Sequence, residues 1–234
     1  SGKIFSLRWL TSFYNLGFFL ILISQLGVKI IKEVSKWEME RRIMDIQMMQ
    51  EALPQYISAT LLTLKLALGG ILLALVIGMI MSFLTYFKVP VLNQIANTYT
   101  AVSRNTPLLI QLFFLYYGLP RIGIRLEKET VGLIGLAFLG GGYMSEAFRG
   151  GIASVPSIQI ESGRAIGLTR FQLARFIILP QGLANSVPAI GANVLFLLKE
   201  TSIFSAIAIM DLTNVTRDLI GMYYLTREYL LMLV

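Results

Sequence analysis

The strongest constraint on the fold of this chain is an apolar tract of 24 residues, Thr60 to Phe83, in which Lys65 is the only charged residue. A helix of about 20 apolar residues crosses the roughly 30 Å of hydrocarbon in a bilayer. Further apolar tracts are Phe13 to Ile31, Thr106 to Leu119, Val131 to Phe148, Gly182 to Met210 and the short Tyr223 to Val234. The sequence therefore predicts an all-α, polytopic membrane helix bundle of about five to six transmembrane helices.

Composition supports this interpretation and excludes several classes of function. With 56% hydrophobic and 14% charged residues, the chain has more apolar surface than a soluble domain of 234 residues buries. It has no Cys and no His, so the usual metal ligands and the usual general base are missing, and we expect no catalytic and no metal-binding residues. The net charge is +7, but the basic residues form no stripe interleaved with aromatic residues, so no nucleic acid partner is expected.

The two ends of the chain require separate interpretations. We expect Phe13 to Ile31 to stay as a membrane anchor, because no small-residue cleavage pattern follows it. Lys32 to Leu53 has the spacing of an amphipathic helix on the membrane surface, with a solvated linker helix as the alternative. Residues 1–52 thus form an additional N-terminal region. The tract from Tyr223 is too short to cross, so the last helix is incomplete in this chain or lies along the interface.

The distribution of charges gives a weak indication of orientation. The Lys and Arg residues divide evenly between the two sides of the predicted bundle, so the positive-inside rule does not choose between them. Among the acids, only Glu161 falls on the side of the N-terminus. This asymmetry slightly favours a cytoplasmic location for the segment around Glu161.

A polar segment between two apolar tracts, ESGRAIGLTRFQLARFIILP (Glu161 to Pro180), has the pattern of a helix, a turn and a helix. The first helix is expected to begin near Ser154, with Pro156 in its opening turn, and to stop at Gly167. Such a rigid element on a membrane surface suits docking to a partner. The alternative is a long loop that lies on the bilayer.

The second short helix carries its own start signals. Thr169 is a predicted N-cap, and Gln172 three residues later completes a capping box. Leu168 and Leu173 are placed to form a hydrophobic staple around the cap. The expected apolar face comprises Phe171, Ala174 and Ile178. Pro180 is expected to end this helix before the next span.

The spacing of these residues resembles the EAA motif of permease subunits of ABC importers. The matching positions are Glu161, Gly167, Ile177, Leu179 and Pro180. The segments RNTPLLIQLFFLYYGLP, YMSEAFRGGIASVPSIQ, LPQ and LLKETSIFSAIAI are similar to the polar amino acid branch of this family. The resemblance covers residues 53–234. Three features depart from it: Ser162 and Gly163 replace two alanines, Asn105 replaces a glycine, and the first span is additional.

The resemblance implies a type I ABC importer permease-like fold whose cytoplasmic coupling loop, 149–180, contacts a separate ATPase. The coupling residues it implies are Ser157, Gln159, Glu161, Arg164 and Gly167. The sequence contains no G-x-x-x-x-G-K-[ST] phosphate loop, so ATP and Mg are expected on the partner, with no cofactor on this chain and no enzymatic activity of its own. Further implied partners are the ATP-binding subunit as a dimer, a second permease subunit, identical or related, and an extracytoplasmic amino acid-binding protein. The implied location is the bacterial cytoplasmic membrane, as a multi-pass protein in the lipid bilayer.

The substrate pathway is a hypothesis drawn from charges inside an apolar tract. Lys199 and Glu200 interrupt Gly182 to Met210, and charges at such depth face a bundle interior or a cavity. We expect the pathway residues to be Asn193, Lys199, Glu200, Thr201 and Ser202, because a Lys and Glu pair complements the two charges of an amino acid. The alternative is that Lys199 and Glu200 cap a helix at the outer surface.

Three other features have structural interpretations. Glu146 and Arg149 are spaced for an i,i+3 ion pair. Lys65 is expected to reach the membrane interface or the partner permease, and Gly140 to Gly142 are expected to allow close helix packing.

The predicted function is therefore the transmembrane subunit of an ATP-driven amino acid importer that works by alternating access. A secondary, ion-coupled transporter and a structural membrane subunit are the alternatives.

Overall fold

The computed structural model describes the backbone of residues 3–233 and the side chains of residues 27–233, apart from 38 and 40–45. The chain divides into two compact units, Ser1–Leu53 and Pro54–Val234. Each unit is described by itself.

The first unit is helical. Helix α1 begins at Lys3 and ends at Tyr86, in the second unit. Much of the predicted anchor, Phe13 to Ile31, lies among residues whose side chains are outside the described part. The predicted surface helix, Lys32 to Leu53, has a helical backbone, and its position on a membrane stays a prediction.

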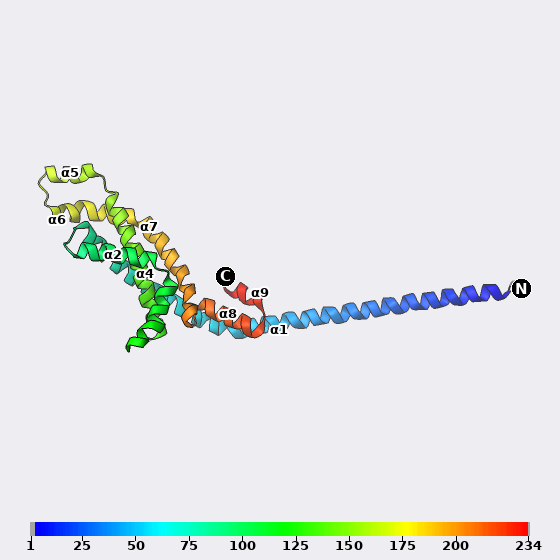
Figure 1. The fold of residues 1–234 in the computed structure, drawn as a ribbon. Coiled ribbons are helices and arrows are strands. Elements are labelled where there is room, and N and C mark those ends of the chain that lie inside the picture. Colours follow the sequence, from blue (N-terminus) through cyan, green and yellow to red (C-terminus); the bar gives the residue numbers. More distant parts are fainter. Residues whose placement is uncertain (1–2, 234) are drawn as a thin grey trace. The chain divides into compact units, whose positions relative to one another are not determined.

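The second unit is a bundle of helices around α4 (Lys128–Ala153) (Figure 1). The other elements are α2 (Leu92–Asn105), α3 (Leu108–Phe113), the π-helix η1 (Phe114–Gly118), the 3₁₀-helix η2 (Leu119–Ile122), α5 (Ser157–Ala165), α6 (Arg170–Leu173), the π-helix η3 (Ala174–Ile178), α7 (Leu179–Glu200), the 3₁₀-helix η4 (Thr201–Ile207), α8 (Leu212–Tyr223) and α9 (Thr226–Leu233). No strand occurs between residues 3 and 233.

Three helical segments among the described residues are long and apolar enough to cross a membrane: Ile46–Tyr86, Lys128–Ala153 and Arg170–Ile207. The first two contain the predicted tracts Thr60 to Phe83 and Val131 to Phe148, the third contains most of Gly182 to Met210, and Leu108–Ile122 is a shorter apolar run at the position of a fourth. The prediction of an all-α membrane helix bundle is confirmed. The tract from Tyr223 contains α9, a helix of 8 residues, after a turn in which Tyr224 is left-handed.

Glycines bring the helices of the bundle into close contact, as the sequence predicted for Gly140 to Gly142. A Cβ on Gly140 would lie 2.7 Å from the side chains of both Ala74 and Leu197, so α1, α4 and α7 meet at this glycine. Atoms of Tyr99 and Ser103, both on α2, occupy the corresponding space beside Gly141 and Gly142. The buried core around this crossing includes Leu66, Ile71, Leu112, Leu136, Met144, Leu197 and Phe204.

The prediction that Pro180 ends the second short helix is wrong. Elements α6, η3, α7 and η4 follow one another without a break from Arg170 to Ile207. In η3 the chain forms a π turn, and the Leu179 N–H donates to the Ala174 carbonyl, five residues earlier. Pro180 follows directly in the first turn of α7, where the wider π turn before it makes room for the proline ring. The π turn therefore lets the proline continue the helix.

Candidate functional site

The polar segment after α4 folds into a compact helical hairpin on a hydrophobic base. Buried Ile152, Val155, Leu173 and Ile178 form this base, against which Phe83 of α1 packs. Gly163 of α5 is also buried, because a Cβ there would meet Leu173, Ile177 and Leu168. In Figure 1, α5 and α6 lie side by side beyond the ends of α4 and α7. The hairpin is thus fixed to the bundle.

The first helix of the hairpin differs from the prediction at its start. Helix α4 continues to Ala153, so α5 begins at Ser157 rather than near Ser154. Pro156 precedes α5 in an extended conformation, because a proline cannot supply the N–H that would continue α4. The predicted stop is confirmed, since Gly167 has a φ of 87°, in the left-handed region that glycine adopts at little cost.

The second helix of the hairpin has the predicted capping box. The Thr169 hydroxyl accepts the Gln172 N–H at 3.3 Å, and the Gln172 side chain accepts the Thr169 N–H at 2.8 Å. The predicted apolar face is wrong at Phe171, which is 67% exposed. Leu173, Ala174 and Ile178 form the buried face, because the helix packs on Gly163 of α5 through Leu173, and Phe171, two residues earlier, points away from that contact.

All five residues proposed for coupling, Ser157, Gln159, Glu161, Arg164 and Gly167, are exposed on or just after α5. The Gln159 side chain accepts a hydrogen bond from Gln181, so it joins α5 to α7. Within the described residues, Glu161 takes part in no ion pair. Ile158 on this helix and Ile166 at its C-cap are 63% and 78% exposed. The helix thus presents an uncompensated carboxylate between two exposed apolar side chains.

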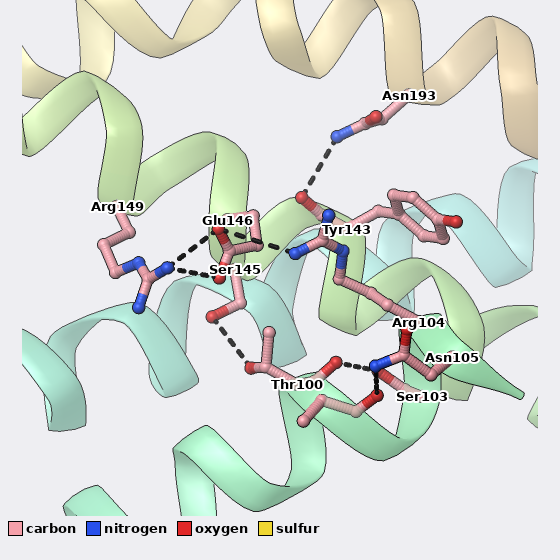
Figure 2. Close-up of polar contacts among 10 residues, drawn as sticks. Thr100, Ser103, Arg104, Asn105, Tyr143, Ser145, Glu146, Arg149 and Asn193 are labelled. Atoms are coloured by element: carbon pink, nitrogen blue, oxygen red, sulfur yellow. Dashed lines mark hydrogen bonds and ion pairs between the residues drawn. The ribbon is translucent and has the colours of Figure 1, made fainter.

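A second polar group lies where α2, α4 and α7 meet (Figure 2). Glu146 pairs with Arg149 at 2.7 Å, as predicted, and also with Arg104 of α2 at 3.6 Å. The Arg104 guanidinium lies 5.3 Å from the centroid of the Tyr143 ring. Asn193 of α7 donates to the Tyr143 carbonyl at 3.1 Å. The Glu146 carboxylate therefore pairs with two arginines, and Asn193 of α7 is hydrogen-bonded to the same turn of α4.

Sequence reasoning missed the contact of Arg104 with Glu146. The two residues are 42 positions apart, and no local periodicity relates them. The available signal was the arginine itself, because a charge next to an apolar tract requires a partner. Asn193, which was grouped with Lys199 and Glu200, hydrogen-bonds into this group instead.

The other proposed pathway residues lie at the end of α7, near the middle of the bundle. Leu197 meets Gly140, the midpoint of α4, so Lys199 and Glu200 follow within one turn of that level. In the single chain Lys199 is exposed and Glu200 is half-buried. Thr201 is buried and its hydroxyl donates to the Leu198 carbonyl, whereas Ser202 is exposed and donates to the Lys199 carbonyl.

Several contacts join the elements at the end of the bundle opposite the hairpin. Lys65 pairs with Glu129 at 2.9 Å, a contact within the chain that the sequence did not indicate, and its predicted reach to the membrane interface or a partner permease stays a prediction. Asp211 is fully buried, caps α8, and accepts the N–H groups of Thr213 and Asn214. Burial raises the pKa of the Asp211 carboxyl, and these hydrogen bonds oppose the increase.

No group of three or more acidic residues that could hold a metal ion occurs in the part of the chain that the structure describes. The polar residues at the helix crossings are charged and amide side chains, which can bind and orient a small charged solute. The exposed helix α5 is a separate feature, which is accessible to a protein partner.

Comparison with known proteins gives consistent matches. Residues 74–233 match the family described as binding-protein-dependent transport system inner membrane component. The chain is 37% identical to the probable amino-acid permease protein YxeN of Bacillus subtilis (strain 168), over 72% of this chain and 76% of that protein. It is 33% identical to the nopaline transport system permease protein NocM of Agrobacterium fabrum, over 77% of this chain and 79% of that protein.

Solved structures show the same fold. A crystal structure of an amino acid ABC transporter with histidines matches with a TM-score of 0.75 and 31% identity, over 79% of this chain and 86% of that chain. An inward-facing MetNI methionine ABC transporter matches with a TM-score of 0.64 and 18% identity, over 78% of this chain and 89% of that chain. At that identity the second match supports the fold alone.

Proposed function

The chain belongs to the family of binding-protein-dependent transport system inner membrane components, and from this premise we propose that it is the membrane-spanning subunit of an ATP-driven amino acid importer. Relatives named as amino-acid and nopaline permeases support this substrate class. The observation that supports coupling best is α5, which packs on the buried base through Gly163, stops before the left-handed Gly167, and carries an exposed Glu161 with no ion pair among the described residues. We place the docking site of a separate ATPase on this helix.

The contacts of α5 suggest how a movement of the ATPase would reach the membrane. Gln159 is hydrogen-bonded to Gln181, and Gly163 packs on Leu173 and Ile177. A displacement of α5 would therefore move the start of α7 with it, because the two share a packed base. Helix α7 ends at Glu200 near the middle of the bundle, so a rigid movement at one end would change the surroundings of the other.

We propose that the substrate pathway passes the end of α7. Lys199, Glu200 and Ser202 are its charged and polar candidates, with Thr201 buried behind them. The helix changes from α to 3₁₀ at Thr201 and ends at Ile207, before the left-handed Ala208, and helix ends near the bilayer midplane are a recurring way to bind charged solutes. Asn193 belongs to the neighbouring group of Arg104 and Glu146, which lies at the same helix crossing.

The remaining components are proposed as separate chains. The sequence has no phosphate loop, so a dimer of ATP-binding subunits would hold ATP and Mg. A second permease subunit, identical or related, would complete the pathway. The family description names a binding protein and an inner membrane, which supports a bacterial cytoplasmic membrane location and delivery of the amino acid by an extracytoplasmic binding protein.

The proposal is tested by purification of the complex from its native membrane in mild detergent. We expect an ATPase with a phosphate loop to co-purify with the native chain and to be lost with Glu161→Arg, because the charge reversal acts directly on α5. Glu127→Arg is the matched control, since Glu127 is also an exposed acid and precedes the opposite end of α4. Co-purification that is equal in all three proteins would contradict coupling through Glu161.

The pathway has its own test. Uptake of amino acids into proteoliposomes is measured for Lys199→Met and Glu200→Gln, with ATPase binding as a control that both variants should pass. We expect reduced uptake with ATPase binding retained. Unchanged uptake in both variants would remove these residues from the pathway.

A further inference from the structure

The Arg104 guanidinium is incompletely satisfied at the point where α2 crosses α4. Its side chain is 41% exposed, and its ion pair with Glu146 is 3.6 Å long. Glu146 already pairs with Arg149 at 2.7 Å, and the guanidinium of Arg104 makes no hydrogen bond to any described residue. Arginine has five N–H donors in a planar fork that matches a carboxylate. Arg104 can therefore bind a second carboxylate, from a small molecule.

Two aromatic rings connect Arg104 to the end of α7. The guanidinium lies 5.3 Å from the centroid of the Tyr143 ring (Figure 2), and the centroid of the Phe196 ring lies 4.9 Å from that of Tyr143. Glu200 follows Phe196 by four residues and Asn193, which contacts α4, by seven, so it lies on the same face of α7. We call Arg104, Tyr143, Phe196 and Glu200 the aromatic wall.

The second end of the aromatic wall carries the opposite charge. Glu200 is half-buried, and its side chain makes neither an ion pair nor a hydrogen bond within the part of the chain that the structure describes. Glu146 and Glu200 both lie in helical segments long and apolar enough to cross a membrane. Unpaired charges in such segments are costly and mark the paths of solutes and ions. The wall thus has spare donors at one end and a carboxylate without a cation at the other.

The distance between the two ends selects among amino acids. Leu197 is level with Gly140, and Glu146 lies six residues from that level toward the hairpin, whereas Glu200 lies three residues from it in the opposite direction. At about 1.5 Å per residue, the two carboxylates are about 13 Å apart along the bundle. A contact at each end takes roughly 3 Å, which leaves about 7 Å for the solute.

A cationic side chain fits this distance. The ammonium and carboxylate of every α-amino acid are attached to one carbon atom, so they cannot reach both ends of the wall. A cation at the end of a four-carbon stem, as in lysine, can reach the second end. The stem would lie along the two rings, whose faces also attract cations.

Acidic and neutral side chains fit less well. An acidic side chain would need a cation at the second end, and Lys199 is the nearest in sequence. One residue turns a helix by about 100°, so Lys199 is turned from Glu200, away from Asn193 and Leu197, with which α7 contacts α4. The exposure of Lys199 agrees with this direction. A neutral side chain would leave Glu200 without a cation.

We propose that the aromatic wall binds an amino acid with a cationic side chain. Arg104 binds its carboxylate, the neighbouring Glu146 binds its ammonium, and Glu200 pairs with the cation at the end of the side chain. The inference rests on the proposed function, because it presupposes that the chain transports amino acids, and it names their class. The bound solute contacts α2, α4 and α7, so a movement of α7 would change its site.

The test measures binding to the full chain in complex with its co-purifying ATPase in nanodiscs, without a binding protein, whose own specificity would enter the result. The probes are L-lysine, L-norleucine, which lacks the side-chain amine, and cadaverine, which lacks the carboxylate. We expect lysine to bind at least about tenfold more tightly than either, because each of the others loses one charge-assisted contact. L-glutamine and L-glutamate should also bind more weakly than lysine.

Two variants assign the ends of the wall. In Glu200→Gln, lysine and norleucine should bind about equally, because the partner of the side-chain cation is gone. In Arg104→Gln, lysine and cadaverine should bind about equally, because the partner of the carboxylate is gone. Glu129→Gln removes an acid of an exposed ion pair at the start of α4 and is the matched control, which should keep the native selectivity. The ratio of two affinities within one variant does not depend on the folded fraction.

The outcomes separate this inference from the proposed function. If the ATPase co-purifies but lysine does not bind, or glutamine or glutamate binds more tightly, the inference is overturned and the proposed function stands. The same holds if either variant keeps the native ratio, because the two ends together define the class of solute. If no amino acid binds and no ATPase co-purifies, the proposed function fails and the inference fails with it.

Discussion

The contact between α4 and α7 beside the hairpin predicts a large difference between two adjacent glycines. A Cβ on Gly151 would lie 2.8 Å from the backbone nitrogen of Ser186 and would also meet the Gly182 carbonyl, whereas a Cβ on Gly150 would have no atom within 4 Å. Ordinary contacts of this kind begin at 3.4 Å, so Gly151→Ala must separate the two backbones by at least about 0.6 Å at Ser186, and by more at the Gly182 carbonyl. No side chain can rotate to relieve this clash.

The magnitude follows from the comparison of the two variants. Both replace a helical glycine by alanine, so both gain about 0.5–1 kcal/mol of helix stability. Only Gly151→Ala overpacks a helix crossing, which costs about 1–3 kcal/mol. The difference between the variants in the free energy of unfolding should therefore be about 1–3 kcal/mol, with Gly150→Ala the more stable. For a chain of this size that difference is roughly 2–12 °C in the unfolding midpoint.

The assay is thermal unfolding of both variants and the native chain in one detergent, together with the ATPase activity of the assembled complex. We expect Gly150→Ala to match or exceed the native midpoint, and Gly151→Ala to fall below it and to weaken coupling, because the hairpin rests on this crossing. Equal midpoints for the two variants would refute the close approach of α4 and α7 at Gly151.

Two further predictions concern helix caps. Thr169→Ala should remove the cap of α6 and cost about 1 kcal/mol of local stability, so hydrogen exchange of the Gln172 amide should be roughly fivefold faster. In Thr169→Ser, which keeps the hydroxyl, this amide should exchange as in the native chain. Equal exchange rates in all three proteins would contradict the cap. Burial raises the folded-state pKa of Asp211, so the native chain is most stable below the unfolded-state pKa and loses stability as pH rises through the folded-state pKa. Asp211→Asn keeps an acceptor for the cap without a charge, so the variant should gain on the native chain as pH rises. The difference between their unfolding midpoints, variant minus native, should be larger at pH 7 than at about pH 4. A difference that does not change with pH would contradict the raised pKa of Asp211.

Local signals in the sequence predicted the parts of the fold that depend on neighbouring residues. The capping box of Thr169 and Gln172, the stop at Gly167 and the ion pair of Glu146 with Arg149 all form within four residues, and all are confirmed. Local rules failed where the helix geometry changed. The π turn of η3 allowed Pro180 to continue the helix, and no residue type specifies a π turn. Phe171 is exposed because the helix packs on α5 through Leu173, a contact that helical spacing alone did not predict.

Contacts between distant residues could not be predicted in the same way. Lys65 meets Glu129 and Arg104 meets Glu146 only because α1, α2 and α4 pack at a particular register. The glycines of α4 were identified as packing residues, but their partners on α1, α2 and α7 were not.

The sequence by itself determined the membrane class of this protein, the approximate helical tracts and the capped hairpin, because hydropathy and capping act over short stretches of chain. The tertiary structure alone decided which charges are shared, how deep the end of α7 lies and which side chains of the hairpin stay uncovered. Those properties depend on how helices cross, and the crossings are set by close packing of residues far apart in the sequence.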